Sequence, residues 1–336
     1  MIVLSNGLTR VADEGALNIA SSLIRRIKRA QPDTTVITYE RQAEESDLHL
    51  PINKFLLNGK LIRLIREKRE SVLYVPFPTR MRPAALRMFI LSRFARWGLK
   101  TLLVMNGEMD KLSALLVRLS GSEVLTVSRQ TYEDYREKIG AQAVYVKTGV
   151  DTAKFCPVPP AQKSALRAKY GIPEDKPVVL HVGHLREGRN IGHMLELPES
   201  WQVLLVVSSY MADSRDADFR QRFVEAPNVR LIEDYVPQIQ ELYQLADVYL
   251  FPVTESGNCI DVPLSALEAA ACGIPVAATA YGELRELLDE PGFYAVESLE
   301  PAALDALLRR AAAEGISPRQ SVLDYDWQLT VSNLLL

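Results

Sequence analysis

The chain has 336 residues, of which 48% are hydrophobic and 24% are charged, and this balance predicts a globular protein of about two domains rather than a disordered chain. No apolar run reaches the roughly 18 to 20 residues that span a bilayer, and the first residues lack a signal-peptide pattern, so we expect a cytoplasmic protein. Three widely spaced cysteines (Cys156, Cys259 and Cys272) favour reduced structural thiols over a disulfide framework.

The net charge of −3 conceals a difference between the two halves of the chain. Residues 1–155 carry 25 basic and 16 acidic residues, whereas residues 156–336 carry 14 and 26. A basic half beside an acidic half predicts that the N-terminal half meets an anionic partner, such as phospholipid head groups or a phosphorylated acceptor. The alternative is an uneven surface charge with no partner.

The first half alternates short apolar strands with helical patterns. We predict strands at Met1–Leu4, Thr35–Thr38, Val72–Val75, Leu102–Met105 and Glu123–Val127. Helical patterns cover Gly15–Arg29, Phe55–Lys68 and Pro83–Trp97. This alternation is typical of an α/β fold with a parallel, doubly wound sheet.

The second half repeats the alternation. We predict strands at Val178–Val182, Val203–Val207, Val229–Ile232, Val248–Phe251 and Val276–Ala278, with helices that include Ile239–Ala246 and Leu264–Ala271. The Pro-rich Phe155–Ala161 cannot continue either sheet and indicates a linker. We therefore predict two Rossmann-like domains, residues 1–155 and 156–320, that face each other across a ligand-binding cleft.

The most informative stretch is Ile260–Thr279, where a loop leads into a helix that stops before a buried strand. Asp261 is placed to cap this helix, and the free amides of Leu264 and Ser265 would face an anion such as phosphate. Glu268 lies about one turn further along. Its carboxylate could accept both hydroxyls of a ribose, or it could lie on a solvated helix face.

Residues Glu268–Val276, Glu-Ala-Ala-Ala-Cys-Gly-Ile-Pro-Val, resemble a motif of the retaining nucleotide-sugar glycosyltransferases of the GT-B fold, in particular the family-four enzymes of bacterial polysaccharides and glycolipids. Val144–Phe155 is similar to the interdomain signature of that family. The resemblance implies a donor-binding C-terminal domain, and a closing helix within 321–336 that packs on the acceptor-binding N-terminal domain. It also implies that main-chain groups near Tyr235 and Val236 bind the nucleobase, although this segment could be a plain loop.

The chain departs from the family where the donor sugar is expected. In the family a first glutamate contacts that sugar, and seven residues separate it from the second; here Ile260 occupies its place. Either Asp261 or Glu255 substitutes for it, or main-chain amides around Gly257 and Asn258 hold the sugar, or donor chemistry is impaired.

Leu180–Asn190 resembles the phosphate-binding segment of the family, with Gly183 after the strand. His184 stands in place of the family's arginine and Arg189 in place of its lysine, and Arg186 offers a second cation. A guanidinium is always charged and can bind a diphosphate bidentately, so Arg189 is our first candidate for holding the leaving group. His184 could donate to phosphate or be structural.

The N-terminal half offers fewer candidates. Gly15, at a helix start, could let a donor phosphate or an acceptor approach the backbone. Asn106 could hydrogen-bond a sugar hydroxyl, and Glu108 could orient the acceptor or act as a base.

The resemblance implies transfer with retention on one sugar face, in which a donor phosphate oxygen helps to take the acceptor proton. In such a mechanism the protein mainly positions the substrates and stabilises the charge on the leaving group. Asp216-Ala217-Asp218 mimics a metal-binding motif but lies in a charged run, Asp213–Arg220, that is typical of solvated surface. We therefore predict no metal and no cofactor, with the nucleotide-sugar as a substrate.

Pro83–Lys100 combines basic and aromatic residues, as an interfacial membrane helix does. Its cations are Arg87, Arg93, Arg96 and Lys100, and its apolar residues include Phe89, Phe94 and Trp97. The alternative is a domain helix that buries its apolar face. Contact with an anionic membrane would place the protein at the inner face of the plasma membrane.

The partners that we expect are a UDP- or GDP-sugar that carries a hexose-type sugar, and a saccharide, lipid-linked or small-molecule acceptor in surface polysaccharide or glycoconjugate synthesis. Nucleic acid is not expected, because the net charge is negative and no reading motif is present. Two alternatives stay open: a catalytically weak homologue that binds nucleotide-sugars or acts as a scaffold, and another enzyme on the same fold, such as an epimerase or a phosphorylase.

Overall fold

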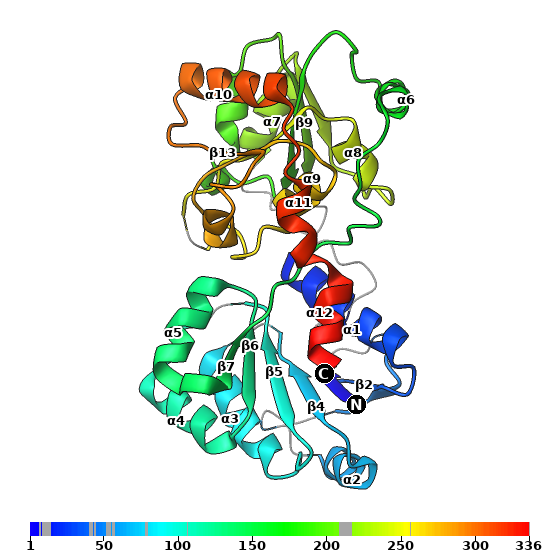
Figure 1. Ribbon diagram of the computed structural model, residues 1–336, viewed down its shortest axis with the longest axis vertical. Helices are drawn as coiled ribbons and strands as arrows, with labels where there is room; N and C mark the ends of the chain where they lie inside the picture. The colour runs from blue at the N-terminus through cyan, green and yellow to red at the C-terminus, as the bar shows by residue number, and fades with distance from the viewer. Residues whose placement is uncertain are drawn as a thin grey trace. The chain divides into compact units, whose positions relative to one another are not determined.

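The computed structural model describes residues 1–6, 8, 15–39, 43, 45–51, 55, 58–77, 80–105, 107–207, 217–255 and 257–335. The chain forms two compact units (Figure 1). The N-terminal unit is Met1–Thr148 with Trp327–Leu336, and the C-terminal unit is Gly149–Asp326. The division therefore falls slightly before the predicted boundary at residue 155, and the segment that returns to the N-terminal unit starts at Trp327 rather than at residue 321.

The N-terminal unit is a parallel sheet covered by helices. Its strands are β1 (Ile2–Ser5), β2 (Thr35–Thr38), β3 (Leu48–His49), β4 (Val72–Val75), β5 (Leu99–Leu103), β6 (Glu123–Thr126) and β7 (Ala143–Tyr145). They lie in the order β3-β2-β1-β4-β5-β6-β7. The helices are α1 (Gly15–Ala30), α2 (Gly59–Lys68), α3 (Met81–Ser92), α4 (Lys111–Ser120), α5 (Arg129–Ile139) and α12 (Trp327–Leu335). None of the described helices is both long and apolar enough to cross a membrane.

Local signals set several helix ends in this unit. The Asp110 carboxylate accepts the amide of Ser113 at 2.8 Å, which caps the start of α4, and Gly121 ends that helix in the left-handed conformation. At the other end of the chain, α12 packs on α1, where the Arg26 guanidinium lies 5.3 Å from the centre of the Trp327 ring. The C-terminal helix thus packs on the N-terminal unit.

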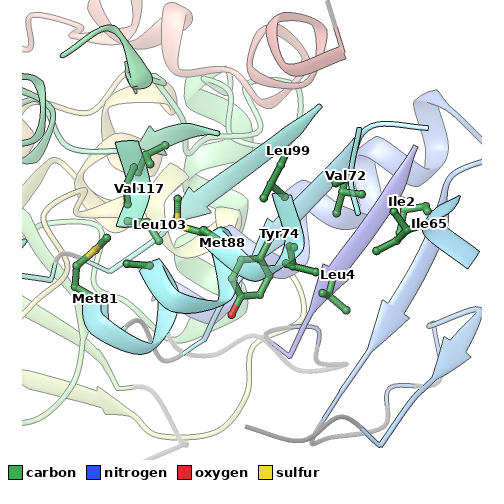
Figure 2. Close-up of a cluster of buried hydrophobic side chains, with 14 of the residues drawn as sticks. Ile2, Leu4, Ile65, Val72, Tyr74, Met81, Met88, Leu99, Leu103 and Val117 are labelled. Carbon is green, nitrogen blue, oxygen red and sulfur yellow. The ribbon is translucent and has the colours of Figure 1, made fainter. Parts of the chain in front are cut away.

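One hydrophobic core cluster of the N-terminal unit lies between one face of the sheet and helices α2, α3, α4 and α5. Figure 2 shows Ile2 and Leu4 of β1, Val72 and Tyr74 of β4, and Leu99 and Leu103 of β5 beside Ile65 of α2, Met81 and Met88 of α3, and Val117 of α4. Alternate residues of each strand point to this face, as the two-residue period of a strand requires.

The C-terminal unit is a second parallel sheet. Its strands are β8 (Val178–Gly183), β9 (Gln202–Val207), β10 (Val229–Ile232), β11 (Val248–Phe251), β12 (Val276–Ala278) and β13 (Phe293–Ala295), in the order β10-β9-β8-β11-β12-β13. The helices are α6 (Pro160–Tyr170), α7 (Ala217–Glu225), α8 (Gln240–Gln244), α9 (Leu264–Ala271), α10 (Pro301–Glu314) and α11 (Arg319–Val322). The strand order reverses between β8 and β11, and ligands of such sheets bind outside the carboxyl ends of the strands at this reversal.

The prediction of two Rossmann-like parallel sheets is confirmed. It was wrong in detail at α3, which ends at Ser92 rather than at Trp97 and buries Met88 and Leu91. This burial favours the domain-helix alternative over an interfacial α3.

Candidate functional site

The predicted phosphate-binding segment follows β8, and the loop that leads to α9 follows β11, so the two segments flank the reversal of the C-terminal sheet. β8 and β11 are hydrogen-bonded neighbours, with Leu180 opposite Tyr249. The sheet therefore brings together two stretches that are about 70 residues apart in sequence.

Arg189 is buried at 6% exposure at the end of the short 3-10 turn Glu187–Arg189. Its Nε donates to the main-chain oxygen of Asn258 at 3.0 Å. The guanidinium lies directly over Gly183. A Cβ added at that glycine would come much closer to Nη1 than 3.0 Å, a separation below which Cβ atoms are essentially never found. A Cβ at Gly188 would likewise come within 3.0 Å of the Asn258 side chain, at 2.8 Å from its Oδ1. The structure thus joins three predicted site residues, Gly183, Arg189 and Asn258.

His181 is a residue of this site that our sequence prediction missed. It is fully buried, and its Nδ1 lies 2.8 Å from the Leu250 oxygen, where it donates as the N–H. Its Nε2 finds no hydrogen-bond partner among the described residues and faces the space over Gly183. Burial, with a smaller contribution from Arg189, lowers the pKa of His181 to about 4, so the ring is neutral at pH 7. The one sequence signal was a polar residue inside an apolar strand.

The first turn of α9 is connected to this group through aromatic side chains. The His181 ring stacks on Tyr249, with 6.1 Å between centroids, and the Tyr249 hydroxyl donates to Ser265 Oγ at 2.7 Å. By helix geometry, the amides of Leu264 and Ser265 have no hydrogen-bond partner within α9.

The capping role predicted for Asp261 is wrong. The residue before α9 is Pro263, and no side chain caps the helix. Asp261 lies two residues too early, and its main-chain oxygen instead accepts the Glu283 amide at 2.8 Å. This contact requires Gly282, which has φ +50° and would place a Cβ against that oxygen.

Glu268 lies on α9 and is mostly buried. The Tyr243 hydroxyl donates to its Oε2 at 2.8 Å, so the Glu268 side chain contacts a partner within the protein and does not lie on a solvated helix face. Burial raises the pKa of Glu268 to about 7, against the smaller opposing effects of the Tyr243 hydrogen bond and Lys154. The carboxylate therefore changes charge near neutral pH, and a ligand that donates hydrogen bonds to it would favour the ionised form.

The remaining donor candidates lie in loops of the C-terminal unit. His184 and Arg186 are half-buried between β8 and the 3-10 turn. Tyr235, 62% exposed, and the half-buried Val236 lie between β10 and α8. Gly257 has φ +92°, a conformation that glycine permits.

The candidates of the N-terminal unit are less connected. Gly15 is the first residue of α1, Glu108 is exposed after β5, and Asn106 lies outside the described residues. Asn6, which we did not predict, bridges the loops after β1 and β4: its Oδ1 accepts the Phe77 amide at 2.8 Å, and its Nδ2 donates to the Phe77 oxygen. This bridge lies where the strand order of the N-terminal sheet reverses.

Within the described part of the chain, no cluster of three or more histidine, cysteine, aspartate or glutamate residues is placed to hold a metal ion. Asp216, the first residue of the Asp-Ala-Asp motif, lies outside the described residues.

Comparison with known sequences places a family domain over the C-terminal sheet. Residues 176–313 match the family model described as Glycosyl transferases group 1. The chain is 29% identical over 231 residues to the GDP-mannose-dependent alpha-(1-6)-phosphatidylinositol monomannoside mannosyltransferase of Mycolicibacterium smegmatis, over 62% of this chain and 59% of that protein. It is 26% identical over 215 residues to the D-inositol 3-phosphate glycosyltransferase of Geodermatophilus obscurus, over 58% and 46% of the two chains. The chain thus spans about half the length of these curated relatives.

Solved structures extend the similarity of fold to the whole chain. A glycosyltransferase from Rickettsia africae superimposes with a TM-score of 0.75 at 14% identity, over 99% of this chain and 96% of that one. Anabaena HepE in complex with UDP gives 0.73 at 15% identity, over 99% and 98%. With its two parallel-sheet units the chain has the GT-B fold, and its residues 176–313 are similar to the Glycosyl transferases group 1 family.

Proposed function

We propose that the protein transfers a sugar, with retention, from a nucleotide diphosphate-sugar bound by its C-terminal unit. The observation that carries the proposal is the continuous group of contacts at the reversal of the C-terminal sheet. It runs from Arg189 over Gly183 and His181, through Tyr249, to Ser265 at the start of α9. This group of contacts joins a buried guanidinium to a helix N-terminus, and both suit the binding of a diphosphate.

The parts of the donor fall to different residues in this proposal. Arg189 and the amides of Leu264 and Ser265 stabilise the charge that develops on the leaving diphosphate. Glu268 accepts the ribose hydroxyls, and main-chain groups near Tyr235 and Val236 bind the base. His184 and Arg186 add donors to the phosphates. The acceptor proton passes to a donor phosphate oxygen, without a metal, so activity should persist in EDTA.

The donor sugar needs a replacement for the glutamate that Ile260 displaces. We propose the main chain around Gly257 and Asn258, because Arg189 fixes this segment through the Asn258 oxygen. Separate Glu255→Gln and Asp261→Asn variants test this choice. Both should keep the Michaelis constant for the donor sugar, and a large rise in either variant would assign the contact to that carboxylate instead.

We further propose an acceptor that carries phosphate. The excess of basic residues in the first 155 residues supports this, and so do the names of relatives that act on phosphatidylinositol mannoside or inositol 3-phosphate. Glu108 and Asn106 would orient its hydroxyl. The pathway would then be glycolipid, polysaccharide or small glycoconjugate synthesis.

A thermal-shift panel of UDP, GDP, ADP and their sugars tests the donor site and identifies the base. The named donor of the mycobacterial relative is GDP-mannose, whereas Anabaena HepE was solved with UDP and UDP-glucose, so the panel must include both bases. One nucleotide should stabilise the wild type and the exposed control Arg310→Ala, but not Arg189→Ala or Glu268→Ala. Equal stabilisation of all four proteins would refute the site.

A second candidate function is nucleotide-sugar binding without transfer, which Ile260 at the sugar contact favours. Donor hydrolysis, measured as release of the nucleoside diphosphate, separates the two. A protein that binds the donor but releases no diphosphate with any acceptor tested would fit the second candidate.

A further inference from the structure

The outer face of α4 carries an apolar stripe. Leu112, Leu115 and Leu119 are 57%, 51% and 55% exposed. They stand at positions i, i+3 and i+7, so they form one row along the helix. The opposite side of α4 already meets the core through Ala114 and Val117. The leucine row is therefore a second apolar face, beyond what the fold of the unit needs.

Cations border this row at both ends and along one side. Lys111 and Arg118 are the exposed cations of α4 itself, which contains no acidic residue. At its C-terminal end, Arg93, the residue that follows α3, donates to the Leu119 oxygen at 2.7 Å while its guanidinium lies 4.6 Å from the centre of the Phe89 ring. At its N-terminal end, Arg82 pairs with Asp110.

The surrounding segment has the same sign of charge. Residues 80–122 contain eight lysines and arginines but two acidic residues. An apolar row with cations beside it is the arrangement by which a helix lies in a membrane interface, with its leucines among acyl chains and its cations at the head groups.

We propose that the leucine row of α4, with Arg93, Lys111 and Arg118, docks the protein on an anionic lipid bilayer. Charge complementarity selects this occupant over a second copy of the chain, because two copies of the same face would bring these cations against each other. The proposal places the membrane contact on α4 and not on α3, because Met88 and Leu91 of α3 are buried. The proposal concerns the N-terminal unit alone and does not depend on the donor site.

Vesicle sedimentation of the full chain, without nucleotide, tests the proposal. The wild type should bind vesicles of phosphatidylglycerol mixed with phosphatidylcholine. Its affinity for pure phosphatidylcholine vesicles should be lower by about tenfold or more, and a rise in salt concentration should release it from the anionic vesicles. The variant Leu112→Ser/Leu115→Ser/Leu119→Ser should lose about tenfold or more in partitioning. The matched control Val224→Ser/Ile316→Ser/Leu329→Ser removes three other residues that are 43% to 50% exposed and should bind as the wild type does.

Two results would overturn the proposal: equal binding of the leucine variant and the control, or equal binding of neutral and anionic vesicles. A dimer that the leucine variant loses in sedimentation velocity, with no vesicle binding by the wild type, would assign the row to self-association. Circular dichroism melting shows whether the variant is folded. Nucleotide thermal shifts that survive in the variant would show that the donor site is intact, so failure of one proposal is distinguishable from failure of the other.

Discussion

The two sheets reverse their strand order at corresponding places, but the side chains gathered there differ. In the C-terminal unit the reversal holds the buried side chains of Arg189 and His181. In the N-terminal unit it holds the Asn6 amide, while cations such as Arg93, just after α3, and Lys111 of α4 lie exposed. A buried charge is costly unless a fixed partner meets it, which suits one small ligand. Exposed charge suits a larger partner that can vary in structure.

The largest expected effect comes from Gly183→Ala. The new Cβ would displace the Arg189 guanidinium, the mobile end of a long side chain, so the fold should tolerate it while the phosphate site does not. We expect donor affinity to fall by roughly a hundredfold in titration calorimetry, with little change in melting temperature. Gly59→Ala is the control, because a Cβ there meets nothing within 4 Å. Unchanged affinity in Gly183→Ala would remove Arg189 from the site.

Glu268→Gln tests the buried carboxylate through pH. Because its pKa is about 7 in the folded protein, against an ordinary value of 4.5 in the unfolded chain, the native protein binds more protons between these values, and the free energy of unfolding falls as pH rises through this window. The glutamine keeps an acceptor for Tyr243 and does not titrate. By urea unfolding the variant should therefore gain roughly 3 kcal/mol on the wild type from pH 4.5 to 8.

The affinity for the donor should change with pH in the opposite direction to the stability, through the same Glu268 carboxylate. If ribose hydroxyls donate to the carboxylate, wild-type donor affinity rises by up to about tenfold between roughly pH 6 and 8, and the affinity of Glu268→Gln does not. Glu297→Gln, at an exposed position, should follow the wild type in both experiments. Parallel pH profiles for all three proteins would contradict the assignment.

His181→Phe probes the unpredicted histidine. The phenyl ring keeps the stacking on Tyr249 but leaves the Leu250 oxygen without its donor, at a cost of about 1 to 3 kcal/mol in unfolding free energy. His193→Phe, at a partly exposed position, is the control and should cost less. Equal losses in the two variants would show that the buried hydrogen bond is unimportant.

The smallest effect on stability is expected in the N-terminal unit, at the exposed leucines of α4. The three serine substitutions on α4 should each change the unfolding free energy by less than about 0.5 kcal/mol, because the leucines are more than half exposed. A loss of several kcal/mol in chemical denaturation would mean that the row packs against the protein itself.

Sequence predicts this fold best where a strand is a continuous apolar run. Val248–Phe251 and Val276–Ala278 match β11 and β12 residue for residue, because both strands are buried on two faces. The edge strand β3 has only Leu48 and His49, and the edge strand β13 ends on an exposed residue, so neither is an apolar run buried on both faces.

The site was predictable by residue type but not by contact. Arg189 and Glu268 stand in recognisable segments, yet their partners, Asn258 and Tyr243, are distant in sequence and are reached only through the fold. Asp261 misled us because its side chain suits a cap, while the helix begins three residues later.

The pairing of the two connecting segments has a practical consequence for dissecting the protein. Gly149–Asp326 is one uninterrupted stretch whose ends meet, since the Val150 amide donates to the Tyr325 oxygen at 3.1 Å and the Thr152 amide to Asp326 at 3.0 Å. It can be excised or transplanted as a module with adjoining ends. A fragment that stops at Thr148 would instead lose the helix that packs on α1, so the N-terminal unit must be expressed with residues 327–336 joined back by a linker.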